Sequence, residues 1–186
     1  FHNANRTPSL SVPYNPDGTW TSDGANLLGT QQNGGRSADT WSEFMTTLNA
    51  EIGLIKDVWS LKGDATYRRG NDVGKSYTLP VPYRTGPDQP MQYTNGNQTT
   101  AQNSTYEVKY NVYNLYTDFH KTFNKKHALG ALAGFNQEYH YFNYFNVQRQ
   151  GLISPLYPTP QLATGNITEK QQIEDWAVRG LFYRLN

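Results

Sequence analysis

Apolar and polar residues alternate with a period of two over the segment 43–69. Phe44, Leu48 and Ile52 share one face of an extended chain, whereas Glu43 and Glu51 share the other. After a short link at 55–58, a second run alternates in the same way. Its apolar positions are Trp59, Leu61, Ala65 and Tyr67, and its polar positions are Lys62, Asp64, Thr66 and Arg68. Two alternating runs joined by a tight link predict a β-hairpin.

The segment 105–145 predicts a second hairpin. Its first strand has apolar residues at the even positions Tyr106, Val108, Tyr110 and Val112. From Tyr113 onwards the apolar residues occupy odd positions, through Leu115 and Phe119. This one-residue shift predicts a bulge or a change of environment along the strand. A link at 122–126 leads into the second strand.

The stretch HALGALAGFNQE, residues 127–138, allows two interpretations. In a helix, Gly130 and Gly134 form a small-xxx-small packing face. In a strand, the two glycines lie on one face, and the other face carries Leu129, Ala131, Ala133 and Phe135. A membrane-spanning helix needs about 20 mostly apolar residues. This run ends at Asn136, so the sequence favours a strand.

Long polar segments separate the predicted strands. The segments 1–42, 70–104 and 146–173 are rich in Pro, Gly, Asn and Thr and are expected to be loops, and 174–186 is expected to be a strand cut short. Short and long connections therefore alternate. Because a compact soluble domain rarely carries such long loops, the pattern favours an outer-membrane β-barrel with short periplasmic turns and long extracellular loops.

In a barrel, the apolar faces contact lipid and the polar faces line a wet lumen. We then expect the interfacial aromatic girdles to include Trp59, Tyr67, Tyr113 and Phe119. The alternative is a soluble extracellular β-sandwich, in which one face of each strand is covered by a second sheet.

The composition agrees with a β-rich chain that has long polar loops. The 186 residues include 14 Tyr, 8 Phe and 4 Trp, whereas charged residues make up 17%. The net charge of +1 gives no reason to expect a nucleic-acid partner. There is no cysteine, and hence no disulfide framework. The chain begins at Phe1 without a methionine and ends within the apolar run LFYRLN, so we expect it to be a piece of a longer protein.

Three segments together resemble the TonB-dependent outer-membrane transporters of the SusC/RagA type. They are NLYTDFHKTFNKKHALGALAGFNQE, LIKDVWSLKGDATYRR and WAVRGLFYRLN. The first carries a strand, a turn with lysine and histidine, and a small-residue strand ending in Gly134, Phe135, Asn136, Gln137 and Glu138. The resemblance covers about residues 40–186.

The resemblance implies an all-β fold, namely about five strands of a large antiparallel transmembrane β-barrel with 22 strands. It also implies an outer-membrane importer of oligosaccharides or peptides. Such importers are energised by the TonB complex and work with a SusD-like surface lipoprotein. The sequence departs from the family because it has no plug domain, no TonB box and no signal peptide. Since five strands cannot close a barrel, we expect this chain to be a segment of the wall.

The sequence predicts no catalytic, cofactor or metal site, and hence no enzyme. The histidines His2, His120, His127 and His140 lack metal-ligand spacing. His120 and His127 flank a predicted turn and are expected to be polar turn and interface residues. Asp17 and Asp23 lie in a turn-rich stretch similar to a calcium loop, but without the spacing of an EF-hand. Asp57, Asp64, Asp118 and Glu138 form no recognisable acid/base pair.

Aromatic residues of the predicted loops are the candidates for cargo binding, because aromatic faces stack on sugar rings. They are Trp20, Trp41, Tyr77, Tyr83, Tyr93 and Tyr157. The alternative is that these loops pack on each other or on the SusD-like surface lipoprotein. The sequence thus leaves two main functions, a wall segment of a nutrient importer and a soluble glycan-binding module. A non-transporting barrel such as an adhesin is a third, weaker alternative.

Overall fold

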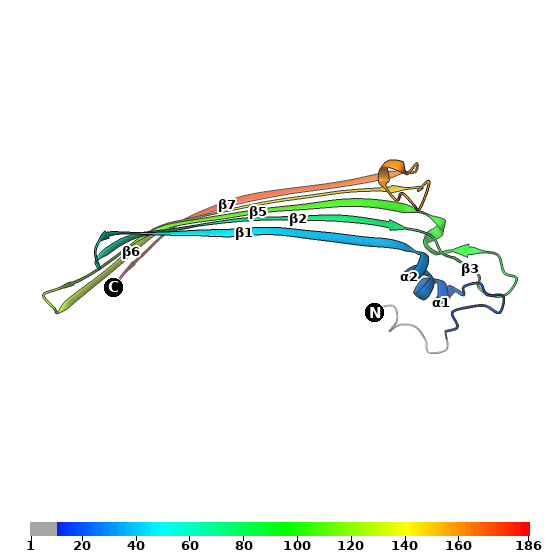
Figure 1. Cartoon of the computed structure of the whole chain (residues 1–186), viewed down its shortest axis with the longest axis horizontal. Helices are drawn as coiled ribbons and strands as arrows, with labels where there is room; N and C mark the ends of the chain where they lie inside the picture. The colour runs from blue at the N-terminus through cyan, green and yellow to red at the C-terminus, as the bar shows by residue number, and fades with distance from the viewer. Residues whose placement is uncertain (1–10) are drawn as a thin grey trace. The chain divides into compact units, whose positions relative to one another are not determined.

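The computed structural model describes residues 11–186, so His2 and the start of the predicted loop 1–42 lie outside the described residues. Five long strands form one sheet in the order β1-β2-β5-β6-β7 (Figure 1). Their bounds are Gly35–Ile55, Trp59–Thr78, Thr100–Phe123, His127–Gln150 and Ile167–Leu185. The prediction of an antiparallel all-β fold is confirmed. The sheet is not closed, because β1 and β7 form its two edges.

Contacts along the chain divide it into two compact units. The described part of unit 1 comprises residues 11–40, 73–104 and 146–170 and contains the helices and long connections. Unit 2 comprises Trp41–Asp72, Thr105–Phe145 and Gln171–Asn186 and contains both short turns. Each unit therefore includes segments of all five long strands.

Both hairpins of unit 2 close through three-residue turns. At the β1–β2 turn, Val58 N donates to Ile55 O at 3.1 Å, and Asp57 has a φ of +58°. At the β5–β6 turn, Lys126 N donates to Phe123 O at 3.1 Å, and Asn124 and Lys125 both have positive φ. Consecutive positive φ values match the right-handed twist of paired strands, which is why such turns connect hairpins tightly.

Unit 1 contains a helical segment within the predicted loop 1–42. It consists of α1 Ser22–Gly24, the π-helix η2 Ala25–Gly29 and α2 Thr30–Asn33. The Thr21 hydroxyl caps it by accepting the Gly24 N–H at 3.0 Å. The sequence did not reveal this helix because it is short and contains two glycines. None of the helices in residues 11–186 is long and apolar enough to cross a membrane.

The remaining elements of unit 1 are short. β3 Pro82–Tyr83 pairs with β4 Gln92–Tyr93, and the 3-10 helices η3 and η4 span Thr94–Asn97 and Pro160–Leu162. They lie in the connections 79–99 and 151–166, which join β2 to β5 and β6 to β7.

The predicted segment boundaries were wrong. The hairpins extend over Gly35–Thr78 and Thr100–Gln150 instead of 43–69 and 105–145, and β7 begins at Ile167 instead of 174. The predicted loops 1–42, 70–104 and 146–173 are correspondingly shorter. The prediction ended each strand where apolar alternation fades, but ladder hydrogen bonds join backbone groups and continue through polar residues.

The cross-strand contacts of β5, Thr100–Phe123, do not support the predicted bulge in the first strand of the second hairpin, because its even-numbered residues keep even-numbered partners on both sides of the shift. Tyr110 bonds to Glu138, and Asn114 bonds to Asp64 and Asn136. All these residues have even numbers and therefore lie on one face. The shift in the sequence pattern therefore reflects a change along that face, from the apolar and aromatic side chains up to Val112 to mostly polar side chains from Asn114.

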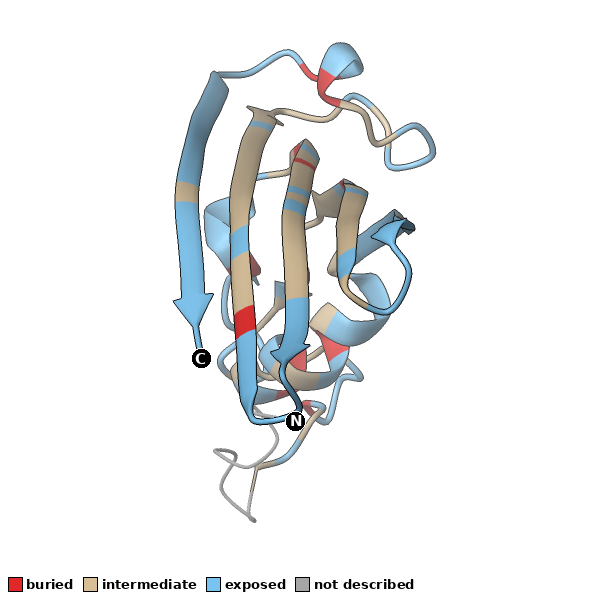
Figure 2. Cartoon of the chain, turned by 90° about the vertical axis from the view of Figure 1, so that its left-hand side faces the viewer, coloured by how far each residue is buried: buried red, intermediate tan, exposed pale blue. Residues whose placement is uncertain are grey.

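Few apolar side chains are buried in either unit. In residues 11–186 the buried apolar residues are Ala25, Val81, Ala101, Val108 and Ala163. Strand β7 is exposed along nearly its whole length, as the strand that ends at the C-terminus shows (Figure 2). The described residues thus lack the core that a soluble β-sandwich builds between two sheets.

Candidate functional site

A ladder of polar contacts crosses one face of the unit 2 sheet, which we call the polar face. It contains odd-numbered residues of β1 and even-numbered residues of β2, β5 and β6. Arg68 forms a two-pronged ion pair with Glu43 at 3.0 and 3.1 Å, and Lys62 pairs with Glu51 at 3.2 Å. Further hydrogen bonds join Thr47 to Thr66 at 2.9 Å, Asn114 to Asp64 at 2.8 Å, Asn136 to Asn114 at 2.7 Å and Tyr110 to Glu138 at 2.9 Å.

Aromatic rings continue this polar face. Trp41 contacts Tyr106 at 5.8 Å between ring centroids, and Tyr106 contacts Phe142 edge-to-face at 4.9 Å. His140 stacks on Trp176 at 5.3 Å. Flat rings beside charged and amide groups provide the contacts that sugars or peptide side chains need. Of these five residues, sequence reasoning found only Trp41. Tyr106 and Phe142 have even numbers, as Glu138 does, so alternation along the strands places all three on one face. This shared face was the signal that could have found them.

The opposite face of unit 2, which we call the apolar face, is exposed. It contains even-numbered residues of β1 and odd-numbered residues of β2, β5 and β6. Leu48 is 71% exposed and Ile52 is 59% exposed. Other large apolar residues exposed on this face are Phe44, Leu54, Trp59, Tyr67, Tyr113, Leu115 and Leu129. Nothing in residues 11–186 covers this patch, which marks it as a surface for another molecule or for lipid.

Gly134 lies on the polar face and permits close packing there. A Cβ at this position would lie 2.6 Å from the Cβ of Tyr116 and even closer to the ring of Phe182. Gly130, four residues earlier, has His120 and Asn186 as its neighbours. The stretch 127–138 is therefore a strand with its glycines on the polar face, as predicted.

A pocket of about 410 Å³ in unit 1 brings together two of the predicted cargo residues, Tyr77 and Tyr157. Its lining also includes Arg36, Lys75 and Leu156. The pocket thus combines two cations with aromatic and aliphatic walls, a mixture that suits a ligand with anionic and apolar parts.

The other predicted cargo residues are not gathered into this pocket. Trp20 stacks on Tyr14 at 4.4 Å between ring centroids. Tyr83 and Tyr93 lie in the β3–β4 pair, in the register Pro82 with Tyr93 and Tyr83 with Gln92. Trp41 belongs to unit 2. The six aromatic residues therefore do not form a single site within either unit.

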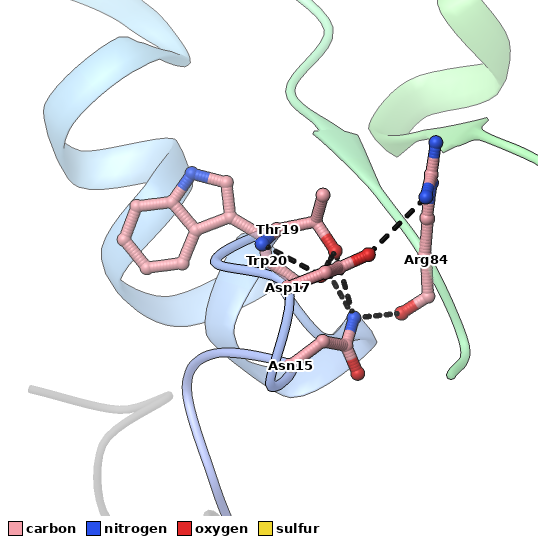
Figure 3. A network of polar contacts seen from close by, with 5 residues as sticks. All are labelled: Asn15, Asp17, Thr19, Trp20 and Arg84. Carbon is pink, nitrogen blue, oxygen red and sulfur yellow. Dashed lines mark hydrogen bonds and ion pairs between the residues drawn. The ribbon is translucent and has the colours of Figure 1, made fainter. Parts of the chain in front are cut away.

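A network of polar contacts holds the connection before α1 against the segment at Arg84 (Figure 3). The buried Asn15 donates through Nδ2 to Thr19 Oγ1 and to the backbone oxygens of Trp20 and Arg84, at 3.1 to 3.2 Å. Asp17 accepts from the Thr19 hydroxyl at 2.6 Å and pairs with Arg84 at 3.2 Å. The network thus holds the backbone of Trp20 next to the ion pair of Asp17 and Arg84.

We expect the order of this loop to depend on pH. The hydrogen bond from the Thr19 hydroxyl, followed by its backbone N–H and by Arg84, lowers the pKa of Asp17 below its ordinary value of 3.8. A lowered pKa contributes stability above pH 3.8, and that contribution is lost as the pH falls through the pKa of the folded state. We expect the protection of the amides at residues 15–20, measured relative to the intrinsic exchange rate at each pH, to fall in that window, and we expect this fall to disappear in Asp17→Asn. Asp23→Asn, which lies outside the network, is the control and is expected to keep the acid response of residues 15–20. An unchanged acid response in Asp17→Asn would contradict the assignment of that response to Asp17.

The two aspartates of the candidate calcium loop are not brought together. Asp17 pairs with Arg84, whereas Asp23 accepts from the Ser11 hydroxyl at 2.8 Å. No group of three or more His, Asp or Glu side chains within residues 11–186 is placed to hold a metal ion. His120 Nδ1 lies 3.1 Å from Asp118, near the β5–β6 turn.

The fold is similar to part of solved structures of the RagAB peptide importer. The structure of its open-open state matches with a TM-score of 0.65 and 19% identity, over 81% of this chain and 16% of that chain. The structure of its closed-closed state matches with a TM-score of 0.65 and 16% identity over the same shares. At this identity the likeness establishes the fold alone, and this chain spans about 16% of the length of those chains. No protein-family model matches the chain, and no curated protein sequence matches it.

Proposed function

We propose that this chain forms part of the wall of an outer-membrane β-barrel that imports nutrients. The observation that carries the proposal is the two-faced sheet of unit 2, whose polar face holds a continuous ladder of polar contacts while its apolar face stays exposed. An exposed apolar face is stable in contact with lipid, and a polar face is stable in contact with a water-filled lumen, as in the strands of membrane barrels.

The soluble β-sandwich is the weaker alternative. A sandwich needs a second sheet over the apolar face, but the second sheet in residues 11–186 is only the two-stranded β3–β4 pair. Exposed apolar patches on soluble monomers rarely exceed a few hundred Å². The large residues of the apolar face extend over four neighbouring strands.

The proposed importer takes up peptides or oligosaccharides, is energised by TonB and works with a SusD-like lipoprotein at the cell surface. The likeness to a peptide importer supports this proposal at the level of the fold. The rings and amides of the polar face support it at the level of chemistry, because they can bind either class of cargo. Tyr77 and Tyr157, in their pocket, are the proposed cargo contacts of unit 1.

Cargo uptake by the full-length protein tests this function. Trp41→Ala removes an exposed ring from the polar face, and we expect the cargo concentration for half-maximal uptake to rise about tenfold, as for loss of a binding hot spot. We expect a smaller rise for Tyr77→Ala combined with Tyr157→Ala. Phe44→Ala is the matched control, since it removes an aromatic ring from the apolar face of the same strand. Equal effects of Trp41→Ala and Phe44→Ala contradict the proposed lumen.

A further inference from the structure

Two cations of unit 2 lie on the apolar face, each above a tyrosine ring. Arg69 Cζ lies 4.2 Å from the centroid of the Tyr67 ring, and Lys109 Nζ lies 4.7 Å from that of Tyr141. Contacts of this kind hold a cation in place at the edge of an apolar surface, where its stem stays in apolar surroundings and its charge stays near water.

Both cations lie just beyond the apolar part of their strands. In β2 the apolar face runs over the nine residues from Trp59 to Tyr67, which is about the length of strand that crosses a membrane when tilted. The next residue on that face is Arg69. In β5 the last aromatic residue of the face is Tyr113, and Lys109 lies four residues beyond it on the long-connection side.

The charge of Arg69 is not neutralised by any carboxylate. Its Nη1 donates to Arg68 O at 3.3 Å and to Asn111 Oδ1 at 3.5 Å, and no acidic residue in 11–186 forms an ion pair with it. Lys109 pairs with Glu107 at 2.8 Å. The three charged groups Arg69, Lys109 and Glu107 therefore carry one net positive charge.

We propose that Arg69 and Lys109 bind the phosphate group of a membrane lipid. Remaining guanidinium N–H groups of Arg69 donate to the phosphate oxygens in the two-pronged geometry that arginine favours, and Lys109 adds a point charge. The acyl chains lie against Tyr67 and Phe44, whose rings meet edge-to-face at 6.4 Å. This inference rests on the proposed membrane location, and it adds a specific lipid site to the wall.

Lipid retention by the full-length protein tests the proposal. Purified wild type in detergent is given a short-chain phosphatidic acid, and retained molecules are counted by native mass spectrometry. Arg69→Gln combined with Lys109→Gln is expected to retain about tenfold less, the loss that corresponds to one charge-assisted hydrogen bond. Arg68→Gln is the matched control, since it removes the neighbouring guanidinium from the polar face. A diacylglycerol with the same chains tests the need for phosphate, and inorganic phosphate tests the need for the chains.

We expect Arg68→Gln to retain the lipid like wild type, diacylglycerol to be retained poorly and millimolar inorganic phosphate to compete weakly. Equal loss in Arg68→Gln, no loss in the double variant, or full displacement by inorganic phosphate overturns the lipid site. A heat-dependent gel shift confirms that each variant is folded. If wild type itself is absent from the membrane fraction, the proposed function fails; if it is folded there and retention ignores Arg69, only the lipid site fails.

Discussion

We expect that replacing Leu48 by arginine prevents assembly of the full-length protein in the proposed outer-membrane barrel, whereas replacing its neighbour Asn49 by arginine is tolerated. Both residues are exposed in β1, so exposure alone predicts that both changes are harmless. Leu48 lies midway along the apolar face between Phe44 and Ile52, and Asn49 lies on the polar face. An arginine facing the bilayer midplane costs about 2–4 kcal/mol, which is a large part of a typical folding stability of about 5–15 kcal/mol.

The assembled fraction is measured on membrane extracts as the band that shifts on boiling. Leu48→Gln serves as a second variant, because it loses the apolar side chain without adding a charge and is expected to reduce assembly less. Assembly of Leu48→Arg at the level of Asn49→Arg would show that the apolar face does not contact lipid.

The second large effect is expected for Gly134→Ala. The added methyl group has no room between Tyr116 and Phe182, so these side chains must separate. Overpacking of this kind costs about 1–3 kcal/mol. We expect the temperature at which the folded band disappears to fall clearly.

Gly53→Ala provides the control on the same face of the sheet. A Cβ at Gly53 meets nothing within 4 Å, and its backbone conformation is one that alanine adopts readily. The change restricts the unfolded chain and is expected to leave stability unchanged or to raise it by a few tenths of a kcal/mol. If the two variants melt alike, Gly134 does not hold the close packing described for the polar face.

Alternation of side chains was enough to predict both hairpins and the two faces of the sheet. The pairs Glu43 with Arg68 and Glu51 with Lys62 join residues that the period of two had already assigned to one polar face. Strand lengths were not predictable in this way, because the strand segments before 43 and after 69 pair through their backbones while most of their side chains are polar, without regular alternation.

The candidate site was predicted only in part. Trp41 was expected in a loop, but β1 begins at Gly35 and places it on the polar face next to Tyr106. Its pairing with Tyr106 joins residues far apart in the chain, and strand register determines such a contact. The pocket around Tyr77 and Tyr157 likewise depends on how the connection 151–166 folds against β2, which local patterns do not encode.

The central claim is that one face of this sheet meets lipid and the other meets water, and spin labels along β6 test it most directly. The chain has no cysteine, so single cysteines can be introduced at each position from 129 to 136, except at the tightly packed Gly134, in a cysteine-free full-length protein and labelled in bilayers. We expect labels at odd positions to be relaxed by oxygen dissolved in lipid and labels at even positions by a water-soluble nickel complex, alternating along the strand. Access of the nickel complex to both sets, with no enhanced oxygen relaxation at the odd positions, would contradict it and favour the soluble sheet.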